Sequence, residues 1–82
     1  MLIFVYDTLT WGKYATVRRC RDRKNGTQYA AKFLRKKRRS TDLKAEILHE
    51  VAVLEACRCN SRIVQLHQVF ESSHDMILLL EL

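Results

Sequence analysis

The spacing of apolar residues changes once along this chain, and that change limits the folds open to it. Residues 28–34, with the sequence Gln-Tyr-Ala-Ala-Lys-Phe-Leu, form a β-prone run. After about residue 42 the spacing becomes that of one helical face and remains so to about residue 58. The apolar residues on this face are Leu43, Ile47, Val51 and Leu54. The pattern predicts strands followed by one amphipathic helix.

Four other β-prone segments flank these two, at residues 2–9, 14–20, 63–70 and 76–80. Asn25-Gly26 predicts a tight hairpin turn before the third strand. Thr41 or Asp42 is expected to cap the helix. The last segment, Met-Ile-Leu-Leu-Leu, has no polar alternation, so we expect both of its faces to be buried. The predicted order is three strands, one helix and two strands, an α+β fold with a five-stranded antiparallel sheet.

The length and composition are those of one small globular domain or of part of a larger one. The chain has 82 residues, of which 48% are hydrophobic and 29% charged, values typical of globular proteins. At this size folding hides only about 60–65% of the surface of the unfolded chain, so stability is expected to be marginal. The opening apolar run is six residues long, which is too short for a membrane span or a signal core. We therefore expect no contact with membranes.

Positive charge is concentrated in one place. The net charge is +6, and five of the 15 Arg and Lys residues lie in the run Arg35–Arg39. Such a run suits an acidic protein partner, a nuclear import signal or phosphates, and it is also what a solvated loop looks like. Binding of nucleic acid would rest on charge alone and would leave the charges described below unexplained, so we do not expect it.

The cysteine content indicates a reducing environment. Cys20, Cys57 and Cys59 are odd in number, which fits free thiols in an intracellular protein of the cytoplasm or nucleus. Cys57 and Cys59 are separated by one residue and lack the usual spacing of zinc ligands. We expect no metal site.

Two charged residues lie within apolar patterns. Lys32 interrupts the third strand, and on a helical wheel Glu50 falls beside Leu43 in the apolar stripe. Removing one member of a buried ion pair costs roughly 3–5 kcal/mol, so isolated charges are not expected at such positions. The pattern predicts that Lys32 and Glu50 form an ion pair. The alternative is that both side chains reach solvent independently.

Small residues lie between the first two strands. Gly12 and Ala15 allow the backbone to approach a phosphate group closely. A simple hairpin turn also favours glycine, so this signal is weak by itself.

Together these features resemble the N-terminal lobe of a eukaryotic serine/threonine protein kinase. The set comprises a strand turn with small residues, Ala-x-Lys at residues 30–32, the helical Glu50, and two strands that end in Leu80-Glu81. The likeness covers about residues 9–82 and is greatest to the death-associated protein kinases and their related apoptosis-inducing subgroup. The segments that carry it are AAKFLRKKRR, AEILHEVAVLE and VQLHQVFE with MILLLE. Residues 1–8 show no family-specific match.

The resemblance implies an ATP site. Lys32 matches the lysine that holds the α- and β-phosphates, and Glu50 matches its helical partner, so these two are the catalytic candidates. Val17 and Ala30 match the residues that contact adenine, and Leu80 matches the gatekeeper. The full set of matched nucleotide-binding positions is Leu9, Thr10, Gly12, Ala15, Val17, Ala30, Lys32, Leu80, Glu81 and Leu82.

The remaining matched positions concern packing and contacts with partners. Glu81 and Leu82 match the start of the hinge, whose backbone binds adenine in the family. Leu54 and Leu66 match the apolar column that joins the helix to the sheet. The run Arg35–Arg39 matches the basic loop at which members of the subgroup contact a protein partner.

The sequence departs from the family in two ways. Thr10 replaces the first glycine of the loop, next to the bulky Trp11, and its β-carbon disfavours positive φ. The motifs His-Arg-Asp, Asp-Phe-Gly and Ala-Pro-Glu are absent, and with them the catalytic base and the magnesium ligands.

We therefore expect residues 1–82 to be the N-terminal part of a kinase domain, ending in the hinge. This part is expected to be inactive alone. Its parent is expected to be a kinase of pro-apoptotic signalling that uses ATP with Mg²⁺, and only a complete kinase would bind a protein substrate. The alternative is a non-catalytic interaction module that binds a partner through its helix face and basic loop.

Overall fold

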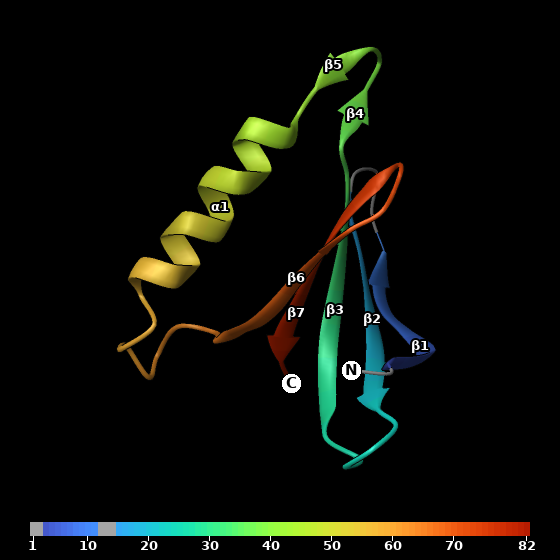
Figure 1. The fold of residues 1–82 in the computed structure, drawn as a ribbon, viewed down its shortest axis with the longest axis vertical. Helices are drawn as coiled ribbons and strands as arrows, with labels where there is room; N and C mark the ends of the chain where they lie inside the picture. The colour runs from blue at the N-terminus through green and yellow to red at the C-terminus, as the bar shows by residue number, and fades with distance from the viewer. Residues whose placement is uncertain (1–2, 12–14) are drawn as a thin grey trace.

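The fold has one antiparallel sheet of five strands and one helix that lies across one of its faces (Figure 1). The computed structural model describes residues 3–11 and 15–82, with side chains from Ala15 onward. The strand order in the sheet is β1-β2-β3-β7-β6. The elements are β1 (Ile3–Trp11), β2 (Ala15–Asp22), β3 (Gln28–Arg35), α1 (Lys44–Ala56), β6 (Leu66–Glu71) and β7 (Asp75–Glu81). The predicted α+β fold class and the order of these six elements are confirmed.

The core consists of two clusters, one on each face of the sheet. Along β7 the side chains alternate between these faces, as in any strand. Leu78 packs toward the helix and Leu79 packs toward the opposite face, and both are almost completely buried. The helix-side cluster is Ile47, Leu66, Met76 and Leu78, and the opposite cluster is Cys20, Tyr29, Ala31 and Leu79. The lack of polar alternation in β7 therefore correctly predicted burial on both faces.

The helix is slightly shorter than the sequence pattern suggested, with Leu43 rather than Thr41 or Asp42 at its N-cap position. Leu43 has no capping side chain. The carboxylate of Asp42 nevertheless accepts a hydrogen bond from the Lys44 N–H at 2.9 Å. It thus satisfies one of the free N–H groups of the first turn from one residue farther away. Thr41 belongs to a short strand instead.

The turn between β2 and β3 is longer than the tight hairpin predicted from Asn25-Gly26. Only Gly26 has positive φ, at 74°, whereas a two-residue type I′ turn needs it at both central positions. The Gly26 N–H donates to the Asp22 carbonyl at 2.9 Å. The Asn25 side chain accepts from the Thr27 N–H at 2.9 Å. The Asn side chain bonds its own loop, which stabilises the wider turn.

A short hairpin that the sequence did not predict lies between β3 and the helix (Figure 1). It consists of β4 (Lys37–Arg38) and β5 (Thr41–Asp42). Arg39 and Ser40 connect them with φ values of 49° and 66°. Positive φ at both central residues is what a type I′ turn requires. Neither residue is Gly or Asn, so the usual sequence signal for this turn is missing.

Replacing Ser40 with glycine should stabilise the fold, because glycine adopts positive φ without the steric cost of a β-carbon. We expect a gain of roughly 0.5–1 kcal/mol, measured as a higher midpoint of thermal unfolding. Ser40→Ala is the matched control, since it keeps the β-carbon and should give no gain. A Ser40→Gly protein that melts at or below the wild-type temperature would contradict this assignment.

Candidate functional site

The two charges singled out in the sequence meet in the structure. Lys32 lies in the middle of β3, and Glu50 lies on the face of α1 that turns toward the sheet. Lys32 Nζ is 2.8 Å from Glu50 Oε1. The predicted ion pair is confirmed.

The pair is less buried than the sequence pattern suggested. The side chains of Lys32 and Glu50 are 28% and 42% exposed. The helix lies at an angle to the sheet (Figure 1). Packing against the sheet therefore buries Ile47 but covers Glu50 only in part. The cost of leaving one of these charges unpaired is therefore well below that of a buried pair, and the pair itself contributes about 0–1 kcal/mol to stability. Its main effect is to fix the position of the lysine ammonium group.

The register of the sheet brings other predicted residues onto the face that carries Lys32. In antiparallel pairs, residues directly opposite each other point to the same face. Val17 lies opposite Lys32, and Ala30 lies opposite Leu80. Ala15 lies opposite Leu34, a residue that packs against the helix-side cluster. Residues 50 or more positions apart in sequence thus form one surface around the ammonium group.

The other predicted nucleotide-binding positions are only partly described. Thr10 pairs with Val17 at the end of β1, which places its backbone beside the same surface. Leu9 also lies in β1, and Gly12 lies outside the described residues. Glu81 ends β7, and its carboxylate accepts a hydrogen bond from the Gln65 N–H at 2.8 Å. Leu82 follows and is largely exposed.

Two leucines assigned to the apolar column contact the same core cluster. Leu66 is buried within the helix-side cluster, and Leu54 packs against it from α1. The sequence pattern did not single out Arg19, which lies opposite Ala30 and therefore shares its face. The Nε atom of Arg19 is buried without a hydrogen-bond partner among the described residues. The alternation of β2 was the signal that could have placed it there.

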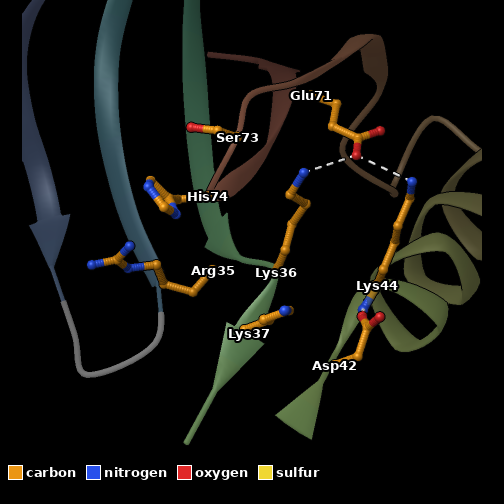
Figure 2. Close-up of a pocket in the computed structure, with 8 residues that line it drawn as sticks. All are labelled: Arg35, Lys36, Lys37, Asp42, Lys44, Glu71, Ser73 and His74. Atoms are coloured by element: carbon orange, nitrogen blue, oxygen red, sulfur yellow. Dashed lines mark hydrogen bonds and ion pairs between the residues drawn. The ribbon is translucent and has the colours of Figure 1, made fainter. Parts of the chain in front are cut away.

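A second charged cluster lies at the far end of β3. Glu71 Oε2 accepts hydrogen bonds from Lys36 Nζ at 2.9 Å and from Lys44 Nζ at 3.1 Å (Figure 2). These bonds lower the pKa of the Glu71 carboxyl group, with Lys36 the larger cause. The side chain of Lys36 is only 18% exposed. The run Arg35–Arg39 is therefore more than a solvated loop, because one of its cations joins two elements of the fold.

The lowered pKa of Glu71 predicts a loss of stability in acid. A carboxyl group whose pKa is lower in the folded state stabilises the fold above its unfolded value, near 4.5, and this contribution disappears as the pH falls through the folded pKa. We expect wild-type protein to melt at a higher temperature than Glu71→Gln at about pH 7, and the difference to shrink toward about pH 3. An unchanged difference across that range would show that the Lys36 and Lys44 bonds do not act through the carboxylate charge.

The buried cysteine and the candidate metal ligands of residues 15–82 do not form a metal site. Burial raises the pKa of the Cys20 thiol, which donates a weak hydrogen bond to the Tyr29 carbonyl at 3.5 Å. Within this range no three His, Cys, Asp or Glu side chains lie close enough together to hold a metal ion. The described part of the chain also has no helix whose length and hydrophobicity would let it span a membrane.

Comparison with known proteins gives a consistent result. The family model of the protein kinase domain matches residues 5–82. The chain is 49% identical over 70 residues to serine/threonine-protein kinase 17A of Oryctolagus cuniculus. This match covers 85% of this chain and 18% of that protein. It is 48% identical over 75 residues to death-associated protein kinase dapk-1 of Caenorhabditis elegans, covering 87% of this chain and 5% of that protein.

A solved structure shows the same fold. The autoinhibited serine kinase domain of the giant muscle protein titin superposes with a TM-score of 0.84 at 25% identity, covering 98% of this chain and 24% of that chain. Death-associated protein kinase 2 of Mus musculus is 37% identical over 80 residues, covering 93% of this chain and 21% of that protein. The chain thus spans about a fifth or less of the length of these curated relatives.

Proposed function

The chain belongs to the protein kinase family, and from this premise we propose that residues 1–82 carry part of an ATP site on the helix-side face of the sheet. The observation that carries the proposal is the 2.8 Å ion pair between Lys32 and Glu50. It holds an ammonium group in place on a surface that also includes Val17 and Ala30. The relatives named above as serine/threonine kinases support the same reaction class, transfer of a phosphoryl group from ATP to a protein hydroxyl.

In this proposal each residue has a distinct task. Val17 and Ala30 pack against adenine, as the corresponding residues do in protein kinases. Leu80 borders the same pocket as gatekeeper. The backbone of Glu81 and Leu82 begins the hinge. The segment from Thr10 near the end of β1 through Gly12 to Ala15 at the start of β2 is proposed to cover the phosphates, with Leu9 preceding it.

Lys32 has donors available for a phosphate group. A lysine ammonium carries three N–H donors, and Glu50 accepts one of them. The side chain is 28% exposed, so the other two can reach a ligand. Glu50 holds the ammonium in place, which lowers the entropic cost of binding phosphate oxygens. Lys32 is thus proposed as the phosphate-binding residue and Glu50 as the residue that positions it.

Magnesium would require residues outside these 82. In protein kinases the metal ions bind the aspartate of Asp-Phe-Gly and the asparagine of the catalytic loop. Neither motif occurs in this sequence. We propose that residues 1–82 form part of a kinase domain, and that Mg²⁺ and the protein substrate bind only when the rest of such a domain is present.

A titration with a fluorescent ATP analogue tests the proposed site. Lys32→Met should weaken binding by about 10- to 100-fold, because charge-assisted hydrogen bonds to the phosphates are lost. Lys24→Met is the matched control. Lys24 is exposed and lies in the loop between β2 and β3, outside the strands that carry the proposed site. Equal affinities of wild-type and Lys32→Met protein would refute the ATP site.

A second candidate is a non-catalytic interaction module. It is favoured by Leu48 and Val53, which lie on α1 away from the sheet and are 46% and 48% exposed. Exposed apolar side chains mark a protein interface where they form part of a contiguous patch. Leu48→Ser with Val53→Ser should then reduce capture by a partner without changing nucleotide affinity. Loss of nucleotide binding in this double variant would count against the module.

We also propose that a protein partner contacts Arg35–Arg39 and that the protein acts inside the cell. Four residues of this run are exposed, and their positive charge suits an acidic protein surface. All three cysteines are free, which is consistent with the cytoplasm or nucleus. The names of the death-associated relatives support a parent kinase in pro-apoptotic signalling.

A further inference from the structure

A pocket separate from the proposed ATP site opens where β3, the β4–β5 hairpin, the start of α1 and the β6–β7 turn meet (Figure 2). It contains none of the residues matched to nucleotide binding. The cavity has a volume of about 440 Å³, within the range of roughly 300–1,000 Å³ that is usual for ligand sites. Its lining residues are Arg35, Lys36, Lys37, Asp42, Lys44, Glu71, Ser73 and His74. We call it the basic pocket.

Hydrogen bonds hold the walls of the basic pocket together. The Lys36 N–H donates to the His74 carbonyl at 2.9 Å, and the Leu43 N–H donates to the Lys36 carbonyl at 2.7 Å. The Ser72 and Asp75 backbones close the β6–β7 turn with a hydrogen bond of 2.9 Å. Segments distant in sequence are therefore fixed relative to one another, and the pocket is formed before any ligand arrives.

The charges of the basic pocket favour an anion. Its lining has four Arg or Lys side chains and two carboxylates. The side chains of Arg35 and Lys37 make no hydrogen bond or ion pair with the other described residues. Lys36 and Lys44 each use one of three N–H donors on Glu71. Figure 2 shows Arg35 and His74 to the left of Lys36, and Lys44 to its right, with the Arg35 guanidinium group directed away from the two lysines. Donors from several elements thus line the cavity.

The two carboxylates narrow the choice of ligand. Asp42 and Glu71 would repel a continuous phosphate backbone that runs across the pocket, and apart from His74 the lining offers no ring on which a base could stack. A single anionic side chain is smaller than a continuous phosphate backbone and need not span both carboxylates. The volume suits one or two side chains of an extended segment rather than a folded domain.

We propose that the basic pocket binds an acidic peptide segment of a partner protein, whose carboxylate or phosphoryl groups pair with the cations Arg35, Lys37 and Lys44. This inference rests on the partner contact proposed above for residues 35–39, and adds the pocket and the chemistry of its ligand. Glu71 occupies part of the site as a competing internal anion. It holds Lys36 and Lys44 in place when no ligand is bound.

Fluorescence anisotropy with labelled peptides tests the proposal on residues 1–82. The probes are an Asp- and Glu-rich peptide with one phosphoserine, and the same peptide with serine. Arg35→Ala combined with Lys37→Ala should weaken binding about tenfold, because charge-assisted hydrogen bonds are lost. Lys24→Ala removes a positive charge far from the pocket and should leave affinity unchanged. Both cations of the double variant are unpaired, so the fold should be retained.

A variant that gains affinity gives a sharper signature. Glu71→Gln removes the competing carboxylate and frees donors of Lys36 and Lys44, so it should tighten peptide binding several-fold. Tighter binding of the phosphorylated peptide supports the proposal with a phosphoryl group as ligand, and equal binding supports it with carboxylates alone. A purely structural role of Glu71 would give no gain in affinity.

Three results would overturn the basic pocket as a peptide site. The first is an equal loss of affinity in Lys24→Ala and in the double variant, which indicates attraction to net charge alone. The second is a single-stranded oligonucleotide of equal charge that binds as tightly as the peptide. The third is a loss of binding in the double variant Arg38→Ala and Arg39→Ala without any loss in the pocket variant. This result would move the partner contact from the pocket to the tip of the β4–β5 hairpin. Nucleotide affinity measured in parallel separates all three from failure of the ATP site.

Discussion

Truncation of Leu78 to alanine is expected to abolish cooperative folding of this chain. Leu78 is 0% exposed and lies in the helix-side cluster with Ile47, Leu66 and Met76. A buried Leu→Ala change costs about 2–5 kcal/mol, through lost transfer energy and the cavity left behind. A sheet of this size with one helix has little stability in reserve, since even whole domains are stable by only about 5–15 kcal/mol. The variant should have no sigmoidal thermal transition by circular dichroism.

The matched control for this prediction is Leu82→Ala. Leu82 is 61% exposed, so its truncation removes the same atoms without opening a cavity. Its melting temperature should equal that of the wild type. A Leu78→Ala protein that unfolds in a sharp transition near the wild-type temperature would show that the helix-side cluster does not limit stability.

Residues 1–82 alone are expected to transfer no measurable phosphate from ATP to protein. Phosphoryl transfer by kinases depends on positioning and on electrostatic stabilisation by metal ions, together with an aspartate that accepts the hydroxyl proton. In the proposed ATP site, Lys32 and Glu50 contribute only to positioning of the phosphates. The motifs that supply the base and the metal ligands do not occur in this sequence. The loss relative to a complete kinase is therefore expected to be total within detection.

Radiolabelled ATP with a generic basic peptide measures this directly. The background is set by Lys32→Met, which removes the proposed phosphate contact. Wild-type protein should give the same label as this variant, even where the two differ in nucleotide affinity. Label above the Lys32→Met background would mean that another residue of the chain supplies the base. It would overturn the prediction that residues 1–82 are inactive alone.

Much of the candidate site followed from local patterns. Lys32 stands out because it is charged within an apolar strand, and Glu50 because it falls in the helical apolar stripe. Both are visible without knowledge of the fold. The degree of exposure of the pair was not predictable, because it depends on the angle between α1 and the sheet. Hydrophobic periodicity shows which face of an element turns inward, but not how closely two elements approach.

The β4–β5 hairpin and the basic pocket show the opposite case. Arg39 and Ser40 adopt positive φ although neither is Gly or Asn, so local residue preference does not predict this turn. Lys36 and Glu71 are 35 residues apart, and nothing in their local sequence links them. They are in contact because the β6–β7 turn lies beside the C-terminal end of β3, where the Lys36 N–H donates to the His74 carbonyl.

Sequence patterns were sufficient to predict the order of the six main elements, the burial of β7 on both faces and the Lys32–Glu50 pair. Each of these depends on the spacing of apolar and charged residues along a single segment, which the chemistry of the side chains fixes. The sharing of one anion by two cations and the position of the basic pocket became visible only in the folded chain. Those contacts depend on strand register and helix position, which arise when the whole chain packs around one core.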